Sequence, residues 1–283
     1  TDVLRMWERR YGFPVPDRDI NGERCYPPEQ VARLRLIKRL MDQGHRPGKL
    51  IATPAEELSA LAPRRSGQME PTAQSDTSGL AELLTLIKQH DATAYLQAMQ
   101  QRLARQGLQR FVQDTIAPLT RRVGEAWEDV SFEVFEEHLF TELTKRVLRQ
   151  AIATLPPGVR GPRVLLTSVP DEQHILGLLM AEAIFALEGA ECIPLGTQMP
   201  LLEIRRAAEA HQADIVALSF SVAFPQRQIP ALLQQLREVL PASAELWAGG
   251  SGVARISPPP GVRLLGTLER AISAIEEWRA AHA

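Results

Sequence analysis

The sequence predicts a multidomain protein that combines all-α segments with an α/β domain. An arginine-rich block opens the chain, a long block with helical periodicity follows, and residues 163–283 alternate between strand-like and helix-like segments. The 283 residues are 45% hydrophobic and 23% charged with a net charge of −2, which is ordinary for a soluble protein with more than one core. No apolar run is long enough to span a bilayer, so we expect no membrane contact.

Changes in composition divide the chain into four parts. Residues 62–79 contain almost no large apolar side chains, and Pro156-Pro157-Gly158 ends the helical pattern. Cys25 and Cys192 lie far apart in segments of different character, so we expect reduced thiols in a cytoplasmic protein. The expected parts are an N-terminal block at 1–60, a flexible linker at 61–79, a helical bundle at 80–157 and a parallel-sheet domain at 158–283.

The N-terminal block has the pattern of three helices and a small hairpin. Residues 2–11 predict a helix, Asn21-Gly22 predicts a tight turn, Pro28 begins a second helix, and residues 46–51 form a short third helix. Residues 1–50 hold 11 Lys and Arg against 7 Asp and Glu, whereas the rest of the chain holds 21 against 27. A basic head on an acidic body favours an anionic partner such as nucleic acid, although an excess this small also arises by chance.

The last part predicts a parallel sheet with helices on both faces, because strand and helix patterns alternate. In such a sheet, ligands bind beyond the carboxyl ends of the strands, where the strand order reverses. His174 follows the first strand, so we expect it at that edge. The expected strands are 164–169, 191–194, 215–220, 245–248 and 262–265, and the expected last helix is 268–281.

His174 is the candidate metal ligand. Glu172 stands two residues before it, and a carboxylate in that position can fix the tautomer of the imidazole and raise its basicity. Gly177 stands three residues after it, where a glycine lets a bulky ligand approach the backbone. The pattern suits the presentation of one imidazole to a large planar metal cofactor. A lone histidine after a strand is, however, more often a capping or packing residue.

The spacing of three motifs makes the interpretation more specific. Glu172-x-His174-x-x-Gly177 resembles the Asp-x-His-x-x-Gly signature of base-off/His-on cobalamin proteins, with Glu in place of Asp. In that family a Ser-x-Leu element and a Gly-Gly pair follow at characteristic distances. Here 41 residues separate Gly177 from Ser219, and 27 separate Ser221 from Gly249-Gly250. The element itself is Ser219-Phe220-Ser221, so its third position departs from Leu.

This resemblance implies a Rossmann-like, flavodoxin-type cobalamin-binding domain. It implies that His174 is the lower axial cobalt ligand and that Glu172 orients it. The residues that it places along the slot for the nucleotide tail are Ser219, Gly249 and Gly250.

The helical block contains a second motif. Trp127, nine residues, and then Glu137-His138 resemble the Trp-x9-Glu-His element of cobalamin-dependent photoreceptor repressors. That resemblance implies a helical cap over the upper face of the corrin, with Trp127, Glu137 and His138 beside a 5′-deoxyadenosyl group; an indole offers a broad apolar face for a nucleoside. In light-sensing members a histidine follows the Trp and ligates cobalt after photolysis. Glu128 stands there instead, and a carboxylate suits this metal centre less well.

The N-terminal block resembles the MerR winged helix-turn-helix, through Leu4 to Pro14, Pro16-x-Arg18 and Gly22-x-Arg24-x-Tyr26. In that family a helix and a turn precede this point, so the winged module is partial, with its N-terminal part missing. We therefore expect that this head cannot close its own core. The resemblance implies a first helix that enters the major groove and a wing that contacts phosphates or the minor groove. The candidate DNA-binding residues are Arg5, Arg9, Arg10 and Tyr11 on the helix, and Arg18, Arg24 and Tyr26 on the wing.

Together these resemblances imply a MerR-family transcription regulator of the CarH/LitR type, and not an enzyme. They imply adenosylcobalamin or another cobalamin as cofactor, and operator DNA as partner. They also imply a homo-oligomer, a dimer or tetramer, that represses in the dark and changes its assembly when light breaks the cobalt–carbon bond. The alternatives are a corrinoid carrier for methyl transfer, a MerR-type regulator that senses cobalamin without photochemistry, and a regulator that has lost cobalamin.

Overall fold

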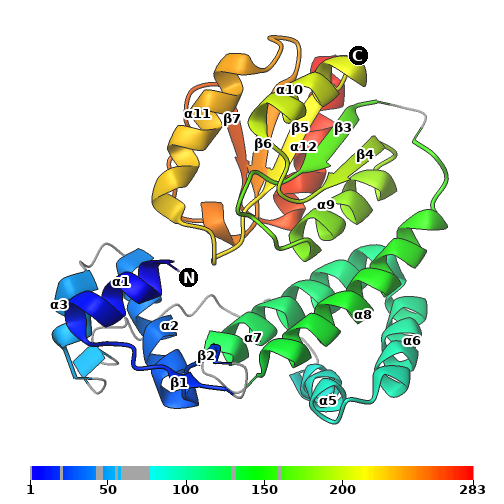
Figure 1. The fold of residues 1–283 in the computed structure, drawn as a ribbon. Helices are drawn as coiled ribbons and strands as arrows, with labels where there is room; N and C mark the ends of the chain where they lie inside the picture. The colour runs from blue at the N-terminus through cyan, green and yellow to red at the C-terminus, as the bar shows by residue number, and fades with distance from the viewer. Residues whose placement is uncertain are drawn as a thin grey trace. The chain divides into compact units, whose positions relative to one another are not determined.

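The computed structural model describes residues 2–19, 22–42, 47–54, 57–58, 77–128, 132–158 and 161–282. The chain divides into two compact units, whose elements Figure 1 shows. The head unit comprises Thr1–Gln74 with Gly124–Glu133, and the body unit comprises Ser75–Val123 with Val134–Ala283. Most of the expected linker at 61–79 lies outside the described residues. No helix in the described ranges has the length and the apolar character needed to cross a membrane.

The head unit has the expected helices and hairpin. Two short strands, β1 (Asp17–Arg18) and β2 (Arg24–Cys25), pair antiparallel, and Gly22 takes a φ of 78° in the turn between them. Asn21, the first residue of the expected turn, lies outside the described residues. The helices are α1 (Asp2–Tyr11), α2 (Pro28–Asp42) and α3 (Pro47–Ala52).

The head also closes a hydrophobic core, so the expectation that it cannot do so is wrong. Trp7 on α1 is only 6% exposed. The side chains of α2 and α3 surround it, and the half-buried rings of Tyr11 and Phe13 pack against the same cluster. The other buried members of this core are Ile37, Leu40, Leu50, Ile51 and Leu58. Among the described residues, one indole and five aliphatic side chains therefore make up a buried core of the head.

The helical part of the body begins at Thr77, three residues before the expected boundary at residue 80. Its second helix contains a break, because Gly107 takes a φ of 72° that interrupts the helical backbone. The helix then continues through a π-helical turn, a form that is rare and short. The helices of this region are α5 (Thr77–Lys88), α6 (Ala92–Arg110), η1 (Phe111–Ile116), α7 (Ala117–Glu128) and α8 (Val134–Ala153).

The sheet of the body has five parallel strands in the order β4-β3-β5-β6-β7, the flavodoxin-type arrangement that the sequence predicts. The strands are β3 (Arg163–Thr167), β4 (Glu191–Gly196), β5 (Ile215–Ser219), β6 (Glu245–Gly249) and β7 (Val262–Leu265). The helices between and after them are α9 (Leu176–Leu187), α10 (Leu201–Ala210), α11 (Ile229–Val239) and α12 (Leu268–Ala281), with short 3₁₀ turns η2 (Gln226–Gln228) and η3 (Ser251–Val253).

Two features of this sheet position the candidate site. The chain leaves β3 toward β4 on one side and later returns to β5 on the other, so the strand order reverses at β3 and β5. The loops after these two strands therefore lie side by side at the carboxyl edge of the sheet. On the helical side, α8 packs directly against α9, and Arg149 on α8 forms an ion pair of 3.1 Å with the buried carboxylate of Glu182 on α9.

Candidate functional site

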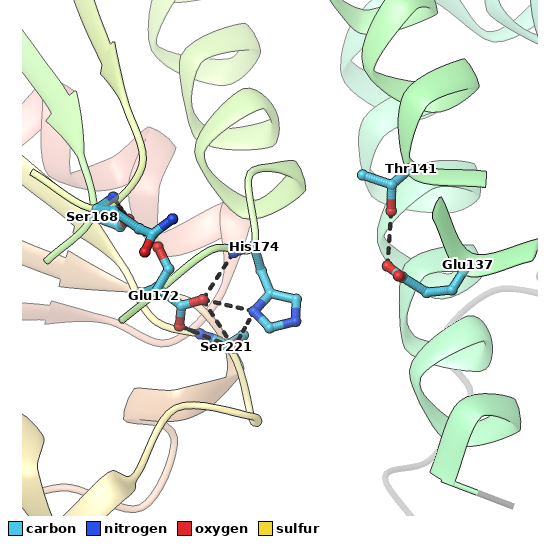
Figure 2. A network of polar contacts seen from close by, with 7 residues as sticks. Glu137, Thr141, Ser168, Glu172, His174 and Ser221 are labelled. Carbon is cyan, nitrogen blue, oxygen red and sulfur yellow. Dashed lines mark hydrogen bonds and ion pairs between the residues drawn. The ribbon is translucent and has the colours of Figure 1, made fainter. Parts of the chain in front are cut away.

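His174 lies where the sequence predicts it, in the loop between β3 and α9 at the carboxyl edge of the sheet (Figure 2). Its side chain is 54% exposed, whereas the side chain of Glu172 is 1% exposed. Glu172 Oε1 lies 2.7 Å from Nδ1 of His174. Because a carboxylate can only accept, Nδ1 donates this hydrogen bond and the lone pair of the neutral ring is at Nε2. The buried carboxylate thus holds the imidazole by its Nδ1 edge, and Nε2 is left for a ligand.

The carboxylate of Glu172 accepts hydrogen bonds at both oxygens. Oε1 also accepts the backbone N–H of His174 at 3.0 Å. Oε2 accepts the backbone N–H of Ser221 at 2.7 Å and its hydroxyl at 2.9 Å. A buried ionised carboxylate is costly unless such partners satisfy it. The three residues therefore form one connected group, in which Ser221 Oγ also lies 3.0 Å from Nδ1 of His174.

The pKa shifts of the pair follow from these contacts. The hydrogen bond to Glu172 raises the pKa of His174 above 6.5; burial opposes this, and the charges of Glu172 and Glu137 add to it. Burial acts to raise the pKa of Glu172, but the hydrogen bonds from His174 and from the backbones of Ser221 and His174 outweigh it, so the pKa lies below 4.5. Glu172 is thus held as a carboxylate, which keeps the His174 ring basic.

Ser221 is a site residue that the sequence reasoning missed. It stands at the third position of the Ser-x-Leu element, where we noted only a departure from Leu. The chain turns after β5 and brings Ser221 back to Glu172, 49 residues away in the sequence. The signal that could have found it was chemical: a second hydroxyl directly after a strand that neighbours the histidine loop.

Gly177 and Ser219 are in contact. Gly177 is the second residue of α9, and a Cβ atom built on it would lie 2.4 Å from Oγ of Ser219. Real Cβ atoms do not approach a hydroxyl so closely, so a Cβ atom at position 177 would force the Ser219 hydroxyl to move. Ser219 ends β5 and is 7% exposed. The pair brings the start of α9 against the end of β5.

The Gly249-Gly250 pair shows the same close approach on the next strand. Gly250 has a φ of 90°, and a Cβ atom there would lie 2.4 Å from the carbonyl oxygen of Phe220. Gly249 ends β6, where a Cβ atom would lie 3.2 Å from the carbonyl oxygen of Leu265. The backbone after β5 and the backbone after β6 are therefore in direct contact beside the histidine loop, with no side chain between them.

The expected cap residues are divided between the two units. Glu137 and His138 lie in the first turns of α8, in the body, and Figure 2 shows Glu137 across from His174. Thr141 Oγ1 donates to Glu137 Oε1 at 3.0 Å, and the side chain of His138 is exposed. Trp127 and Glu128 end α7, in the segment that groups with the head, and their side chains lie outside the described residues.

The donor set determines which kind of metal group the site could hold. Within the part of the chain that the structure describes, no three His, Cys, Asp or Glu side chains gather into a site for a bare metal ion. A single exposed imidazole with a fixed tautomer suits a metal whose other positions are filled by a macrocycle. The glycines at 177 and 250 leave the backbone bare beside it, which suits the close approach of a bulky ligand. These residues therefore fit a corrin.

The candidate DNA residues lie on α1 and on the wing of the head. Arg5, Arg9 and Arg10 are exposed, and Tyr11 is half-buried with its hydroxyl against Gly48. Two wing residues bind to Glu8 on α1: Arg24 Nε donates to Oε2 at 3.3 Å, and Tyr26 Oη donates to Oε1 at 2.6 Å. Arg18 donates within the wing, to the carbonyl oxygen of Gly22 at 2.7 Å.

Glu8 therefore connects the hairpin to the first helix. The hydrogen bond from Tyr26 lowers the pKa of Glu8, burial opposes this, and the charge of Arg24 adds to the lowering. Burial, followed by the hydrogen bond to Glu8, raises the pKa of Tyr26. The wing is thus fixed against a helix whose exposed face presents arginines.

Comparisons with known protein families divide the chain along the same lines. Residues 1–51 match the family of MerR HTH family regulatory proteins, and residues 80–152 match the B12 binding domain. The second match covers the helices of the body and does not include His174. These helices are therefore similar to a B12 binding domain independently of the His174 motif.

Two transcriptional repressors and one corrinoid protein are similar to the chain over most of its length. The transcriptional repressor CarH of Myxococcus xanthus is 29% identical over 253 residues, which span 88% of this chain and 84% of CarH. The repressor CarA of the same organism is 29% identical over 233 residues, which span 82% of this chain and 76% of CarA. The monomethylamine corrinoid protein of Methanosarcina barkeri shares the fold of the body, with a TM-score of 0.56, 14% identity, and coverage of 71% of this chain and 99% of that one.

The two family matches stand in the same order along this chain as the head and the histidine-bearing body described above. The likeness to CarH and CarA runs through both parts and the segment between them. The N-terminal part is therefore similar to MerR HTH regulatory proteins, the helices of the body are similar to a B12 binding domain, and most of the chain is similar to the CarH and CarA repressors.

Proposed function

We propose that this chain is a DNA-binding transcriptional repressor whose oligomeric state, and with it DNA binding, responds to adenosylcobalamin. The observation that carries the proposal is the anchored imidazole: His174 is held at Nδ1 by the buried carboxylate of Glu172 and leaves Nε2 exposed. Both similar whole proteins are named as transcriptional repressors, which supports repression as the direction of regulation.

In this proposal His174 Nε2 would ligate the cobalt of the cofactor, and Glu172 and Ser221 keep the imidazole in one tautomer and one orientation. Ser219, Gly249 and Gly250 would line the slot for the nucleotide tail, and Gly177 contacts Ser219. When bound, adenosylcobalamin supplies a cobalt–carbon bond that light can break. The residues proposed for the upper face are Trp127, Glu137 and His138.

We assign one role to each part of the chain. The head at 1–60 binds operator DNA, the segment at 61–79 links it to the body, the helices at 80–157 form the cap, and the domain at 158–283 binds the cofactor. Arg5, Arg9, Arg10 and Tyr11 face the groove, and Arg18, Arg24 and Tyr26 fix or extend the wing. The cofactor controls DNA binding only if it binds one assembly state, monomer or dimer or tetramer, more tightly than another.

Light is the part of the proposal in which this sequence departs from the light-sensing pattern that it resembles. Glu128 follows Trp127, in the position of the histidine that ligates cobalt after photolysis in light-sensing members. We expect photoconversion to be weaker or altered, since a carboxylate is the poorer ligand for this metal. A regulator that senses cobalamin without photochemistry is the second candidate function, and Glu128 is the observation that favours it.

A corrinoid carrier for methyl transfer is the third candidate, which the fold likeness of the body to a corrinoid protein favours. The match of residues 1–51 to a regulatory family opposes it, because a methyl carrier does not require a DNA-reading head. Methyl transfer to or from the cobalamin-loaded chain by a corrinoid methyltransferase would support the carrier.

The test of the proposed function follows size and DNA binding together. The full chain is mixed with adenosylcobalamin in the dark, its mass is followed by light scattering, and its binding to DNA upstream of its own gene is followed by a gel shift. We expect a larger assembly that binds DNA, and no such response in His174→Ala. An unchanged mass and unchanged DNA binding with cofactor bound would contradict the proposed response. Illumination of the same sample separates a light sensor from a cobalamin sensor.

A further inference from the structure

One buried hydroxyl joins two loops at the carboxyl edge of the sheet. Ser168 follows β3 directly, and it is 0% exposed. Its Oγ donates to the carbonyl oxygen of Glu172 at 2.6 Å and accepts the backbone N–H of Gln198 at 3.0 Å. A serine hydroxyl can donate one hydrogen bond and can also accept. Here its donor and acceptor roles are unambiguous, because the carbonyl oxygen can only accept and the backbone N–H can only donate. Figure 2 shows Ser168 beside the backbone of Glu172.

Both loops contain a residue in a backbone conformation that side chains disfavour. Asp171 has a φ of 68° and Gln198 has a φ of 61°. A non-glycine residue in the left-handed region persists when the surrounding contacts hold it there. The hydroxyl of Ser168 bonds to Gln198 itself and to the residue after Asp171. It is therefore placed to hold both conformations at once.

The backbone of Ser168 ties the same two segments. Its N–H donates to the carbonyl oxygen of Gly196 at 3.3 Å, and its carbonyl oxygen accepts the N–H of Met199 at 2.9 Å. The loop from Gly196 to Met199 follows β4 and is thus attached to the end of β3 by three hydrogen bonds, all to one residue. The only contact among these that continues to the histidine loop is the one from Ser168 Oγ to Glu172.

We propose that Ser168 is a positioning residue for the lower cobalt ligand: by fixing the main chain of Glu172 it sets the place of the carboxylate that orients His174. The chain of contacts runs from Ser168 Oγ to the carbonyl of Glu172, from the carboxylate of Glu172 to Nδ1 of His174, and so to the direction of Nε2. This inference rests on the proposed role of His174 as ligand. It adds a residue that no cobalamin signature of the chain includes.

Thr167 provides a matched control, because it stands next to Ser168 and is also 0% exposed. Its Oγ1 donates to the carbonyl oxygen of Gly196 at 2.9 Å and lies 3.4 Å from that of Ser168, so it reaches the end of β4 and not the loop of Glu172. Thr167→Val and Ser168→Ala each remove one buried hydroxyl at the end of β3. Only the second removes the contact to the histidine loop.

The experiment uses the full chain loaded with hydroxocobalamin and then reduced to the cobalt(II) form. Electron paramagnetic resonance reports the axial nitrogen of His174 as a splitting of the cobalt signal. We expect the full splitting in the unaltered chain and in Thr167→Val, and a mixture with a large unligated fraction in Ser168→Ala. Hydroxocobalamin affinity should fall by about tenfold in Ser168→Ala, which is the lower end of the loss that outer partners of metal ligands cause. Ser168→Cys, which is nearly isosteric but a weak donor, should give an intermediate fraction.

Full splitting and unchanged affinity in Ser168→Ala would overturn the inference, as would equal losses in Ser168→Ala and Thr167→Val. If Ser168→Ala does not fold, Ser168→Cys decides, and full ligation in that variant overturns the inference. The proposed function fails separately: absence of the nitrogen splitting in the unaltered chain, or its persistence in His174→Ala, would show that His174 is not the ligand.

Discussion

Glu172 Oε1 lies 2.7 Å from Nδ1 of His174, and the carboxylate is buried while the imidazole is exposed. A fixed, buried charge thus sets the tautomer of a group that faces outward. Ser221 completes the arrangement by donating both its N–H and its hydroxyl to the same carboxylate. A ligand that arrives at Nε2 meets an imidazole that already has its orientation.

Removal of the Ser221 hydroxyl should weaken cofactor binding. Ser221→Ala deletes the bond of 2.9 Å to Glu172 but keeps the backbone bond of 2.7 Å, so the carboxylate stays in place with one partner fewer. We expect hydroxocobalamin affinity to fall by about tenfold, measured by absorption titration. Ser273→Ala, an exposed serine on α12, is the control and should bind as the unaltered chain does. Equal affinities for the two variants would count against the role given to Ser221.

The contact between Gly177 and Ser219 predicts a rescue. Gly177→Ala would place a Cβ atom 2.4 Å from Ser219 Oγ, and overpacking of this kind costs about 1–3 kcal/mol of unfolding free energy. The double variant Gly177→Ala with Ser219→Ala leaves only the Cβ of residue 219, at 3.6 Å, so it should regain most of the loss. Urea denaturation measures all three chains.

A second glycine serves as the control for this rescue. Gly124 lies inside α7, where an added Cβ atom would meet nothing within 4 Å, so Gly124→Ala should stabilise by up to about 1 kcal/mol through helix propensity. If Gly177→Ala behaved like Gly124→Ala, the close approach at Ser219 would not exist in solution.

The ion pair between Arg149 and Glu182 should respond asymmetrically to mutation. Glu182 is 7% exposed and Arg149 is 41% exposed, so only the carboxylate is left buried when its partner is lost. We expect Arg149→Leu to lower the unfolding free energy near neutral pH by about 2 kcal/mol, less than for a fully buried pair because Arg149 is part-exposed. Arg149→Leu with Glu182→Gln should regain stability, because no buried charge remains.

The same pair predicts a pH dependence. Burial raises the pKa of Glu182 above 4.5, against the charge of Arg149. A carboxyl group whose pKa is raised in the folded state contributes most to the free energy of unfolding below its unfolded pKa. That contribution is lost as the pH rises through the folded pKa. The defect of Arg149→Leu should therefore shrink as the pH falls toward 4.5, in urea denaturation at several pH values. A defect that stays constant with pH would exclude this cause.

The head should bind DNA through its exposed arginines in a salt-dependent way. Arg9 is exposed on α1, so Arg9→Ala should weaken binding to a random-sequence duplex and lower the slope of log affinity against log salt by about one. Fluorescence anisotropy measures both. Arg205→Ala, on α10 of the body, removes an exposed arginine of the other unit and should leave the slope unchanged. An unchanged slope in Arg9→Ala would remove Arg9 from the interface.

Much of the sheet and the histidine loop could be predicted from the sequence, because both depend on local pattern. The strand runs alternate with helices, and Glu172 lies two residues from His174, so a short loop brings them together. Ser221 could not be predicted in the same way. Its contact with Glu172 depends on the turn after β5 and on the pairing of β3 with β5, which join residues 49 apart in sequence.

The head shows the opposite case, in which a family pattern misled the prediction. In the family, a helix and a turn precede the pattern found here, which suggested that the core of the head would stay open. The actual packing places Trp7 in one buried cluster with apolar side chains of α2 and α3 and with Leu58. Which apolar side chains meet in this cluster depends on tertiary packing, and sequence periodicity alone does not report it.

The most direct test of the account is the absorption spectrum of the full chain with adenosylcobalamin in the dark, compared with that of His174→Ala. We predict that the unaltered chain binds the cofactor with a base-off, histidine-ligated spectrum, and that His174→Ala loses that ligation and most of its affinity. Absence of bound cobalamin in the unaltered chain, or an identical spectrum and affinity in His174→Ala, would contradict the central claim that His174 is the cobalt ligand.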